Sequence, residues 1–267
     1  MKKELLSQIL TKNNINFEET TADKNGKKVD CFCVWKGEER PPVCPNIYPD
    51  KLDDEEQVMK TIEYAFEKVP VKEEMLEKLL DKDFIIDNCY SCIRRKSDNE
   101  DIIKWPVYGD LEEYVRVKVN DEASCVITKK LAESADIKDF TNLRRAARAN
   151  SHSTITVRNL MEVISEMQMF PLPDNYETEY TEGQIYVLSC NNNMNGASAM
   201  LHADVLTDLA DKCNVNELTI LPSSIHEVLV YTGSMNENQA NDMVTSVNNE
   251  VVNDSDVLSN HIYKFYV

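Results

Sequence analysis

The chain has 267 residues, of which 42% are hydrophobic and 28% charged, and its 47 acidic against 29 basic side chains give a net charge of −18. This composition is ordinary for a globular protein of one large domain or two modest ones. The charge excludes nucleic-acid binding over a broad face, because that affinity comes largely from lysine and arginine. The start lacks a secretory signal and no window holds 18 consecutive apolar residues, so we expect a cytoplasmic protein without a membrane span.

The N-terminal and central part of the chain is predicted to be a mixed helix and hairpin region. Turn signals at Asn25-Gly26 and Asn120-Asp121, acidic residues at 53–56 and alternating apolar positions divide it into short elements. The predicted elements are helix 4–10, strand 29–35, helix 53–66, helix 72–80, strand 84–93, hairpin 114–128, helix 137–149 and helix 157–167.

A loop rich in proline and acidic residues follows, over 171–183. Prolines at 171 and 173 and the polar run after them are typical of a joint between structural units. The sequence therefore predicts two regions, an N-terminal and central mixed α/β region over 1–173 and a C-terminal module over 183–267.

The C-terminal module is predicted to have the order β-α-β-β-α-β, which is that of a ferredoxin-like split unit. Its strands are predicted over 184–189, 218–221, 228–231 and 262–266, and its helices over 197–212 and 236–247. Both helices are expected on one face of the sheet, the first through a wide apolar stripe. The fold class is therefore α+β (mixed α/β). The stripe consists of Met200, Leu201, Val205, Leu206 and Leu209.

Several segments of the chain carry a family resemblance. They are I-Y-V-L-S at 185–189, N-G-A-S-A-M-L at 195–201, I-L-P-S-S-I-H-E-V at 220–228 and D-V-L-S-N-H-I-Y at 256–263, with weaker echoes in P-N-I-Y at 45–48 and A-A-R-A-N-S at 146–151. With these segments the chain resembles the bacterial family catalogued as domain of unknown function 5688. The resemblance implies an uncharacterised family without an assigned activity, whose pattern does not feature the cysteines of this chain.

Eight cysteines are present, and without a secretory signal we interpret them as free thiols. Cys31 and Cys33 share one strand face, and Cys89 and Cys92 form a C-x-x-C pair. Together with Cys44 they offer enough thiolates for a zinc site. The apolar neighbours favour buried thiols that pack as small hydrophobic side chains, over both zinc binding and a redox pair.

The segment Ser223-Ser224-Ile225-His226-Glu227 is the sharpest catalytic candidate. Ser224, His226 and Glu227 supply a hydroxyl, an imidazole and a carboxylate, the three groups of a nucleophilic triad. Such a triad is assembled in space, however, and the chain has no G-x-S-x-G motif. The simpler interpretation is a β-turn whose hydroxyls bind the backbone.

Arg144, Arg145 and Arg148 fall on one side of a predicted helix and can bind an anion. The favoured alternative is a solvated face whose arginines pair with the abundant acidic residues.

The absence of catalytic, cofactor or phosphate motifs favours a non-enzymatic protein-binding or regulatory module without a cofactor, whose partner is a protein and, given the charge of −18, a basic one. One alternative is an inhibitor borne by a mobile element or phage, which uses an acidic surface against a nucleic-acid-handling protein. The other is a hydrolase or transferase with a site near Ser224 and His226.

Overall fold

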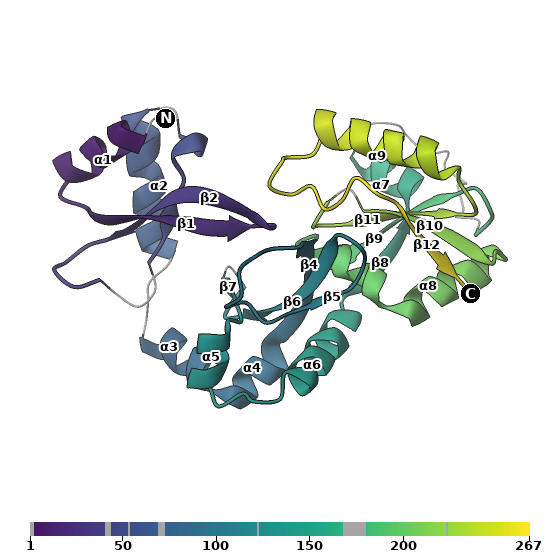
Figure 1. Ribbon diagram of the computed structural model, residues 1–267, viewed down its shortest axis with the longest axis horizontal. Helices are drawn as coiled ribbons and strands as arrows, with labels where there is room; N and C mark the ends of the chain where they lie inside the picture. The colour runs from purple at the N-terminus through teal and green to yellow at the C-terminus, as the bar shows by residue number, and fades with distance from the viewer. Residues whose placement is uncertain are drawn as a thin grey trace.

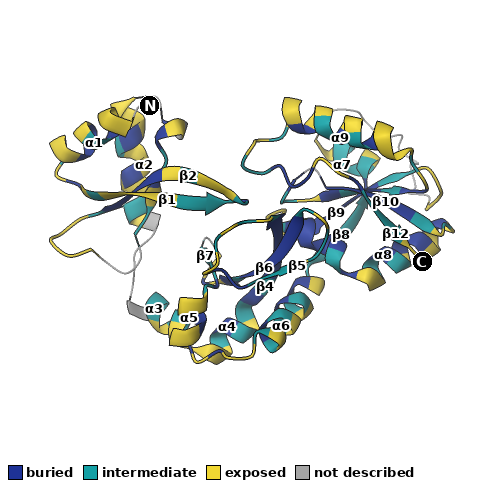
Figure 2. Ribbon diagram, in the orientation of Figure 1, coloured by how far each residue is buried: buried dark blue, intermediate teal, exposed yellow. Residues whose placement is uncertain are grey.

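The computed structural model describes residues 3–40, 44–52, 54–68, 73–121, 123–167, 180–222 and 224–267. They form three antiparallel sheets, each with its own helices, which we call the N-terminal unit, the central unit and the C-terminal module (Figure 1). Buried residues lie mainly on the inner strands, such as β4 (Cys89–Arg95), β6 (Leu111–Lys118), β9 (Ile185–Cys190) and β10 (Glu217–Leu221), whereas β1 (Asn16–Lys24) and the outward surfaces of the helices are largely exposed (Figure 2). The mixed α+β class is therefore confirmed.

The N-terminal unit is a three-stranded sheet of order β1-β2-β3 covered by two helices. Its core includes Leu6, Leu10, Phe32 and Ile62. The predicted Asn25-Gly26 turn joins β1 to β2. Both turn residues have positive φ, 50° and 77°, as a two-residue hairpin turn requires. The elements are α1 (Lys3–Lys12), β1 (Asn16–Lys24), β2 (Lys27–Trp35), β3 (Asn46–Ile47), η1 (Pro49–Lys51) and α2 (Glu55–Lys68).

The central unit has a sheet of order β4-β6-β5, with β7 also paired to β6, so the predicted hairpin over 114–128 is present. Its elements are α3 (Glu73–Leu80), α4 (Lys82–Asn88), β4 (Cys89–Arg95), β5 (Lys104–Pro106), β6 (Leu111–Lys118), β7 (Ser124–Val126), α5 (Lys129–Ser134) and α6 (Phe140–His152).

One prediction in the central unit is wrong: residues 84–88 are helical, and the strand begins only at Cys89. The side chain of Asp81 caps this helix by accepting hydrogen bonds from the backbone N–H groups of Asp83 and Phe84. Ile85 is fully buried in the core of the unit. The cap and this burial override the β-propensity of the apolar run.

The C-terminal module is a five-stranded sheet of order β12-β10-β11-β9-β8. The predicted β-α-β-β-α-β order is present, and β8 with α7 precedes it. The predicted joint falls mostly on residues 171–179, which lie outside the described residues, and the division into 1–173 and 183–267 stays a prediction. The elements are β8 (Ile155–Asn159), α7 (Leu160–Glu166), β9 (Ile185–Cys190), η2 (Gly196–Leu201), α8 (Ala203–Cys213), β10 (Glu217–Leu221), β11 (Val228–Thr232), α9 (Glu237–Glu250) and β12 (Tyr263–Tyr266).

The prediction that both helices pack on one face of this sheet is wrong. Helix α8 packs on the face that carries Val228 and Val230, whereas α9 packs on the face of Leu229 and Tyr231 (Figure 1). Handedness explains the difference. The connection from β9 through α8 to β10 and the connection from β11 through α9 to β12 both cross the sheet toward β12. Strands β9 and β10 are parallel to each other, and β11 and β12 run in the opposite direction. Two right-handed crossovers must then lie on opposite faces.

The tip of the β1–β2 hairpin ties the three units together. Asn25 Nδ2 donates to the carbonyl oxygen of Val257 at 2.6 Å, and its Oδ1 accepts from the backbone N–H of Arg95 at 2.9 Å. Arg94 pairs with Asp23 of the hairpin and, at 2.8 Å from Nε, with Glu112 of β6. We call these six residues the hairpin-tip junction: Asp23, Asn25, Arg94, Arg95, Glu112 and Val257.

Among the described helices, none combines the length and the apolar character needed to cross a membrane.

Candidate functional site

A polar cleft of about 450 Å³ lies between the central unit and the C-terminal module. One wall comes from the start of β4, the β6–β7 turn and the end of α6. The other comes from the end of β9 and the loop that leads into η2. Most lining residues have uncharged polar side chains, among them Asn88, Ser91, Asn150, Ser151, Ser189 and Asn195, although apolar atoms make up the larger part of the cleft surface.

The second wall depends on a close approach that only glycine permits. A Cβ at Gly196 would lie 2.4 Å from Ser189 Oγ and 2.7 Å from the carbonyl oxygen of His226. Asn195, just before it, has a φ of 58°, which asparagine tolerates better than most residues. The Asn-Gly pair therefore lets η2 begin directly against β9 and β11, which brings the 195–201 segment to the cleft.

A buried carboxylate supports the first wall. Glu113 is fully buried on β6 and accepts hydrogen bonds from Ser91 Oγ at 2.9 Å, Arg144 Nε at 2.7 Å and Arg148 Nη2 at 2.6 Å. Burial acts to raise the pKa of Glu113, but the hydrogen bonds and positive charges of Arg148 and Arg144 outweigh it, so the pKa is lower than usual. Glu113 is therefore ionised at neutral pH and fixes both arginines.

The structure thus separates the three arginines that the sequence grouped as anion-binding candidates. Arg144 and Arg148 pair with Glu113, whereas Arg145 donates from Nη2 to Asn142 Oδ1 at 2.7 Å. Arg144 and Arg148 therefore pair with an acidic residue, as the favoured alternative expects. Anion binding by these arginines stays a prediction.

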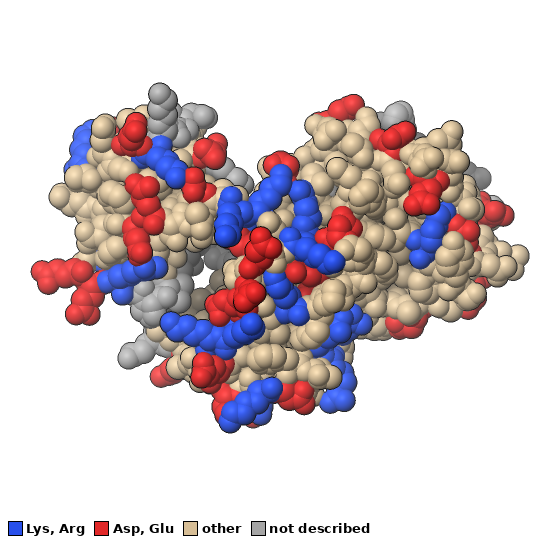
Figure 3. Space-filling model, viewed as in Figure 1, with Lys and Arg blue, Asp and Glu red and all other residues tan. Residues whose placement is uncertain are grey.

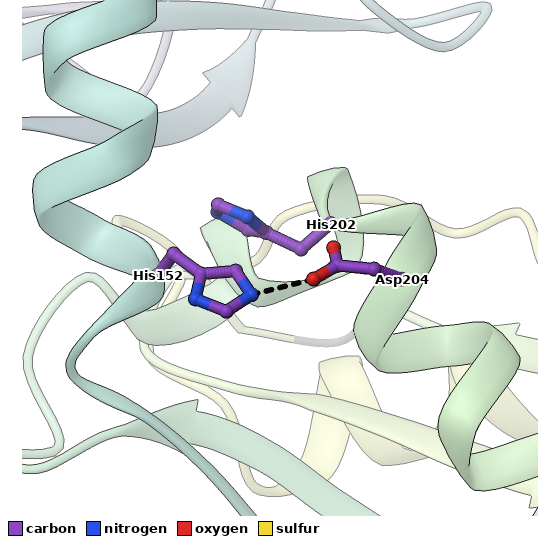
Figure 4. A group of neighbouring side chains, drawn as sticks. All are labelled: His152, His202 and Asp204. Carbon is purple, nitrogen blue, oxygen red and sulfur yellow. Dashed lines mark hydrogen bonds and ion pairs between the residues drawn. The ribbon is translucent and has the colours of Figure 1, made fainter.

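His152, His202 and Asp204 meet where α6 ends and α8 begins (Figure 4). His152 is the last residue of α6, His202 is the N-cap of α8 and Asp204 lies in its first turn. His152 Nε2 lies 2.6 Å from Asp204 Oδ2, and the two imidazole rings are in edge contact with centroids 5.3 Å apart. We call Ser151, His152, Ser198, His202 and Asp204 the cleft junction, since each belongs to a segment that forms or adjoins a cleft wall.

His202 is the unusual member of this group. Only 7% of the residue is exposed, and within the described part of the chain its Nε2 atom has no hydrogen-bond partner. Burial, followed by the nearby His152, lowers the pKa of His202 below its usual value. The imidazole is therefore neutral at neutral pH, which is the form that binds metal ions. Among the described residues, this is the one group of three or more side chains suited to hold a metal ion.

The predicted catalytic segment lies beside the cleft but is not arranged as a triad. Ser224 Oγ accepts from the backbone N–H of His226 at 3.0 Å, and His226 Nδ1 accepts from the backbone N–H of Asn195 at 3.3 Å. Glu227 is exposed, and Ser223 lies outside the described residues. These bonds match the turn interpretation, and they place the His226 ring at the base of the Asn195-Gly196 loop.

The cysteines of the proposed zinc site belong to different sheets. Cys31 and Cys33 lie on β2, and Cys89 and Cys92 lie on β4, where they contact different hydrophobic clusters. All are free and buried. Burial raises the pKa of Cys89 to about 12, which keeps its thiol protonated at neutral pH. The four thiols are therefore not gathered in one place among the described residues, and even Cys89 and Cys92 belong to different clusters.

Sequence reasoning missed the histidine cluster. His152 and His202 are far apart in the sequence and share no metal-binding spacing. The one local signal is His-Ala-Asp at 202–204, which places an imidazole and a carboxylate at the start of a helix. Several segments of the family resemblance do converge here, since 146–151, 185–189 and 195–201 all contribute to the cleft walls.

No curated protein and no solved structure gives a significant match to the chain. The model of a family described as "Family of unknown function (DUF5688)" matches residues 1–266. The expected membership is therefore confirmed, and the chain belongs to this family of unknown function.

Proposed function

We propose that this protein is a non-enzymatic binding module that holds an extended polypeptide segment of a partner protein in the polar cleft. The observation that carries the proposal is the lining of the cleft. Amide and hydroxyl side chains stand on both walls. Several of them, including Ser91, Asn150 and Ser189, already bind other groups of the protein, but an amide or hydroxyl group can take part in more than one hydrogen bond. An extended main chain presents alternating N–H and C=O groups, so neutral groups of this kind match it.

The small number of charged residues in the cleft favours an uncharged segment of the partner as the ligand. Among its described lining residues only Asp87, Lys118 and Asp121 carry a charge, although the whole chain carries −18. A volume of about 450 Å³ lies within the usual range of about 300–1,000 Å³ for ligand pockets. The net charge of the protein would act at longer range and attract a basic partner before the segment enters the cleft.

We propose the bacterial cytosol as the place of this function. None of the eight cysteines, all of which lie in the described part of the chain, forms a disulfide, which suits a reducing compartment.

The alternatives have less support. On the face shown in Figure 3, acidic side chains are interspersed with lysine and arginine and form no continuous stripe, so that face does not resemble a nucleic-acid backbone. The hydrogen bonds of Ser224 and His226 run to the backbone and do not join the hydroxyl to the imidazole. We therefore propose no second function.

A peptide library tests the proposal. Displayed random peptides are selected on the full chain, and the enriched peptides are then measured by calorimetry against the variant Asn191→Arg. Asn191 is exposed and lines the cleft, so the long arginine side chain should obstruct it. Asn238→Arg, at an exposed position on α9, is the matched control.

We expect at least a tenfold loss of affinity for Asn191→Arg and no change for Asn238→Arg. Equal binding by both variants, or no enriched peptide on the wild-type chain, would contradict the proposal.

A further inference from the structure

The side chains of His152, His202 and Asp204 carry an inference that does not depend on the proposed function. Each offers one ligand atom, and the three atoms all lie within 4.8 Å of one another. They come from two different units, since α6 belongs to the central unit and α8 to the C-terminal module. The packing of the two units therefore brings the three side chains together.

The donor set matches a particular class of ion. Two imidazole nitrogens with one carboxylate oxygen suit divalent first-row transition metals such as zinc, whereas Mg²⁺ and Ca²⁺ prefer all-oxygen sites. Three protein ligands with a remaining position for water or another ligand are typical of open zinc sites.

His202 supplies an independent observation. A buried nitrogen without a partner destabilises a folded protein, and buried polar groups in native proteins are nearly always satisfied. The Nε2 atom of His202 has no partner among the described residues, although the residue is only 7% exposed. This nitrogen is therefore left for a ligand to bind.

The geometry needs only small changes to close around an ion. Zinc–ligand distances of about 2.0–2.2 Å place tetrahedral donors about 3.3–3.6 Å apart. His152 and Asp204 have side chains that are 48% and 68% exposed, so both can change rotamer without disturbing the core. Their 2.6 Å hydrogen bond would be replaced by two bonds to the ion.

We propose that His152, His202 and Asp204 form a binding site for a divalent first-row transition metal ion, with Zn²⁺ as the best match. The ion joins α6 to α8 at the cleft junction. Because it binds the folded protein through two units, it also stabilises the arrangement of those units.

The test uses the full chain after removal of metals with a chelator. Zn²⁺ is titrated by calorimetry, and thermal unfolding is followed with and without Zn²⁺. We expect one equivalent to bind and the Tm to rise by about 5 °C or more at saturating Zn²⁺. His152→Gln and Asp204→Asn should each lower the affinity at least tenfold and abolish most of the Tm shift.

Control variants distinguish binding at this site from binding by other side chains of the protein. His261→Gln changes an exposed histidine, and Asp211→Asn changes an exposed carboxylate on α8. Neither residue belongs to the proposed site, so both variants should bind Zn²⁺ like the wild-type chain. Co²⁺ serves as a spectroscopic probe, because thiolate ligands give strong charge-transfer absorption that His and Asp ligands lack. No binding by the wild-type chain would overturn the proposal. The Cys33 and Cys44 side chains interact and are the nearest thiol alternative. Binding that survives His152→Gln and Asp204→Asn but is lost in Cys33→Ser with Cys44→Ser would also overturn the proposal.

Discussion

The hairpin-tip junction and the cleft junction both hold units of this protein together, but they are built differently. Strand β6 carries two adjacent carboxylates, one in the hairpin-tip junction and one behind the cleft. Glu112 pairs with Arg94 at the hairpin tip, and Glu113 pairs with Arg144 and Arg148 behind the cleft. The hairpin tip is closed by direct bonds between units, such as Asn25 to Val257. The cleft junction instead leaves a polar cavity and the unpartnered Nε2 of His202.

This difference suggests different roles for the two junctions. At the hairpin tip the polar groups of the three units bind one another directly. The cleft junction keeps one buried nitrogen, His202 Nε2, without a partner among the described residues, and a cavity lies next to its Ser151 and Ser198. We therefore assign structure to the hairpin tip and binding to the cleft.

The largest expected loss of stability comes from a substitution that disrupts the hairpin-tip junction. Gly26→Ala places a Cβ 2.7 Å from the carbonyl oxygen of Lys96 and 2.9 Å from that of Arg95, at a φ of 77°. We expect a loss of about 4 kcal/mol in the free energy of unfolding, measured by chemical denaturation. Gly37→Ala is the control, since Gly37 has a φ of 92° with nothing within 4 Å, and should lose only about 1 kcal/mol. Equal losses would show that the hairpin tip is not tightly seated.

A second change tests the support of the cleft junction by α8. Leu206 is 1% exposed in the core of the C-terminal module, so Leu206→Ala should lower the free energy of unfolding by about 3 kcal/mol. Asp208→Ala, at an exposed position of the same helix, should change it by less than about 0.5 kcal/mol. A loss below about 0.5 kcal/mol for Leu206→Ala would mean that α8 faces the sheet differently.

Glu113→Gln tests the carboxylate behind the cleft. The substitution removes the charge between Arg144 and Arg148, and we expect a loss of about 2 kcal/mol in unfolding free energy at pH 7. The folded-state pKa of Glu113 lies below the usual 4.5, so its contribution is complete above that pH and is lost as the pH falls through the folded-state pKa.

Denaturation of both proteins between pH 7 and pH 3 checks this sign. The difference between wild type and Glu113→Gln should stay constant down to about pH 5 and then shrink. Glu133→Gln, at an exposed position, should show no such pH-dependent difference. A difference that grows in acid would contradict the ionised Glu113.

The smallest effect concerns Asp204. Its ion pair with His152 is exposed, so Asp204→Asn should change the stability of the metal-free chain by less than about 0.5 kcal/mol. A large loss without metal, measured by denaturation in the presence of a chelator, would mean that Asp204 serves structure alone and would remove the contrast between the two junctions.

Much of the fold follows from local patterns. The Asn25-Gly26 turn, the stripe through Leu206 and Leu209 and the alternation in β6 each predict the element that forms. The prediction of a strand over 84–88 was wrong because the helix cap formed by Asp81 outweighed the β-propensity of that segment. The sequence also could not give the faces of α8 and α9, because these depend on strand order, and strand order is set by long-range pairing.

The candidate site was less predictable. Its donors are contributed by α6 and α8, which only the packing of two units brings together, and single residues such as His152 have no local pattern that marks them. The arginines were recognised as a row, but their buried partner Glu113 reads in the sequence as one of 47 acidic residues.

Anomalous diffraction from a crystal soaked in Zn²⁺ tests the contrast between the two junctions most directly. We predict one strong peak among His152, His202 and Asp204, with none at the hairpin tip. A peak at Cys33 and Cys44 with none at the cleft junction would contradict the assignment of binding to the cleft.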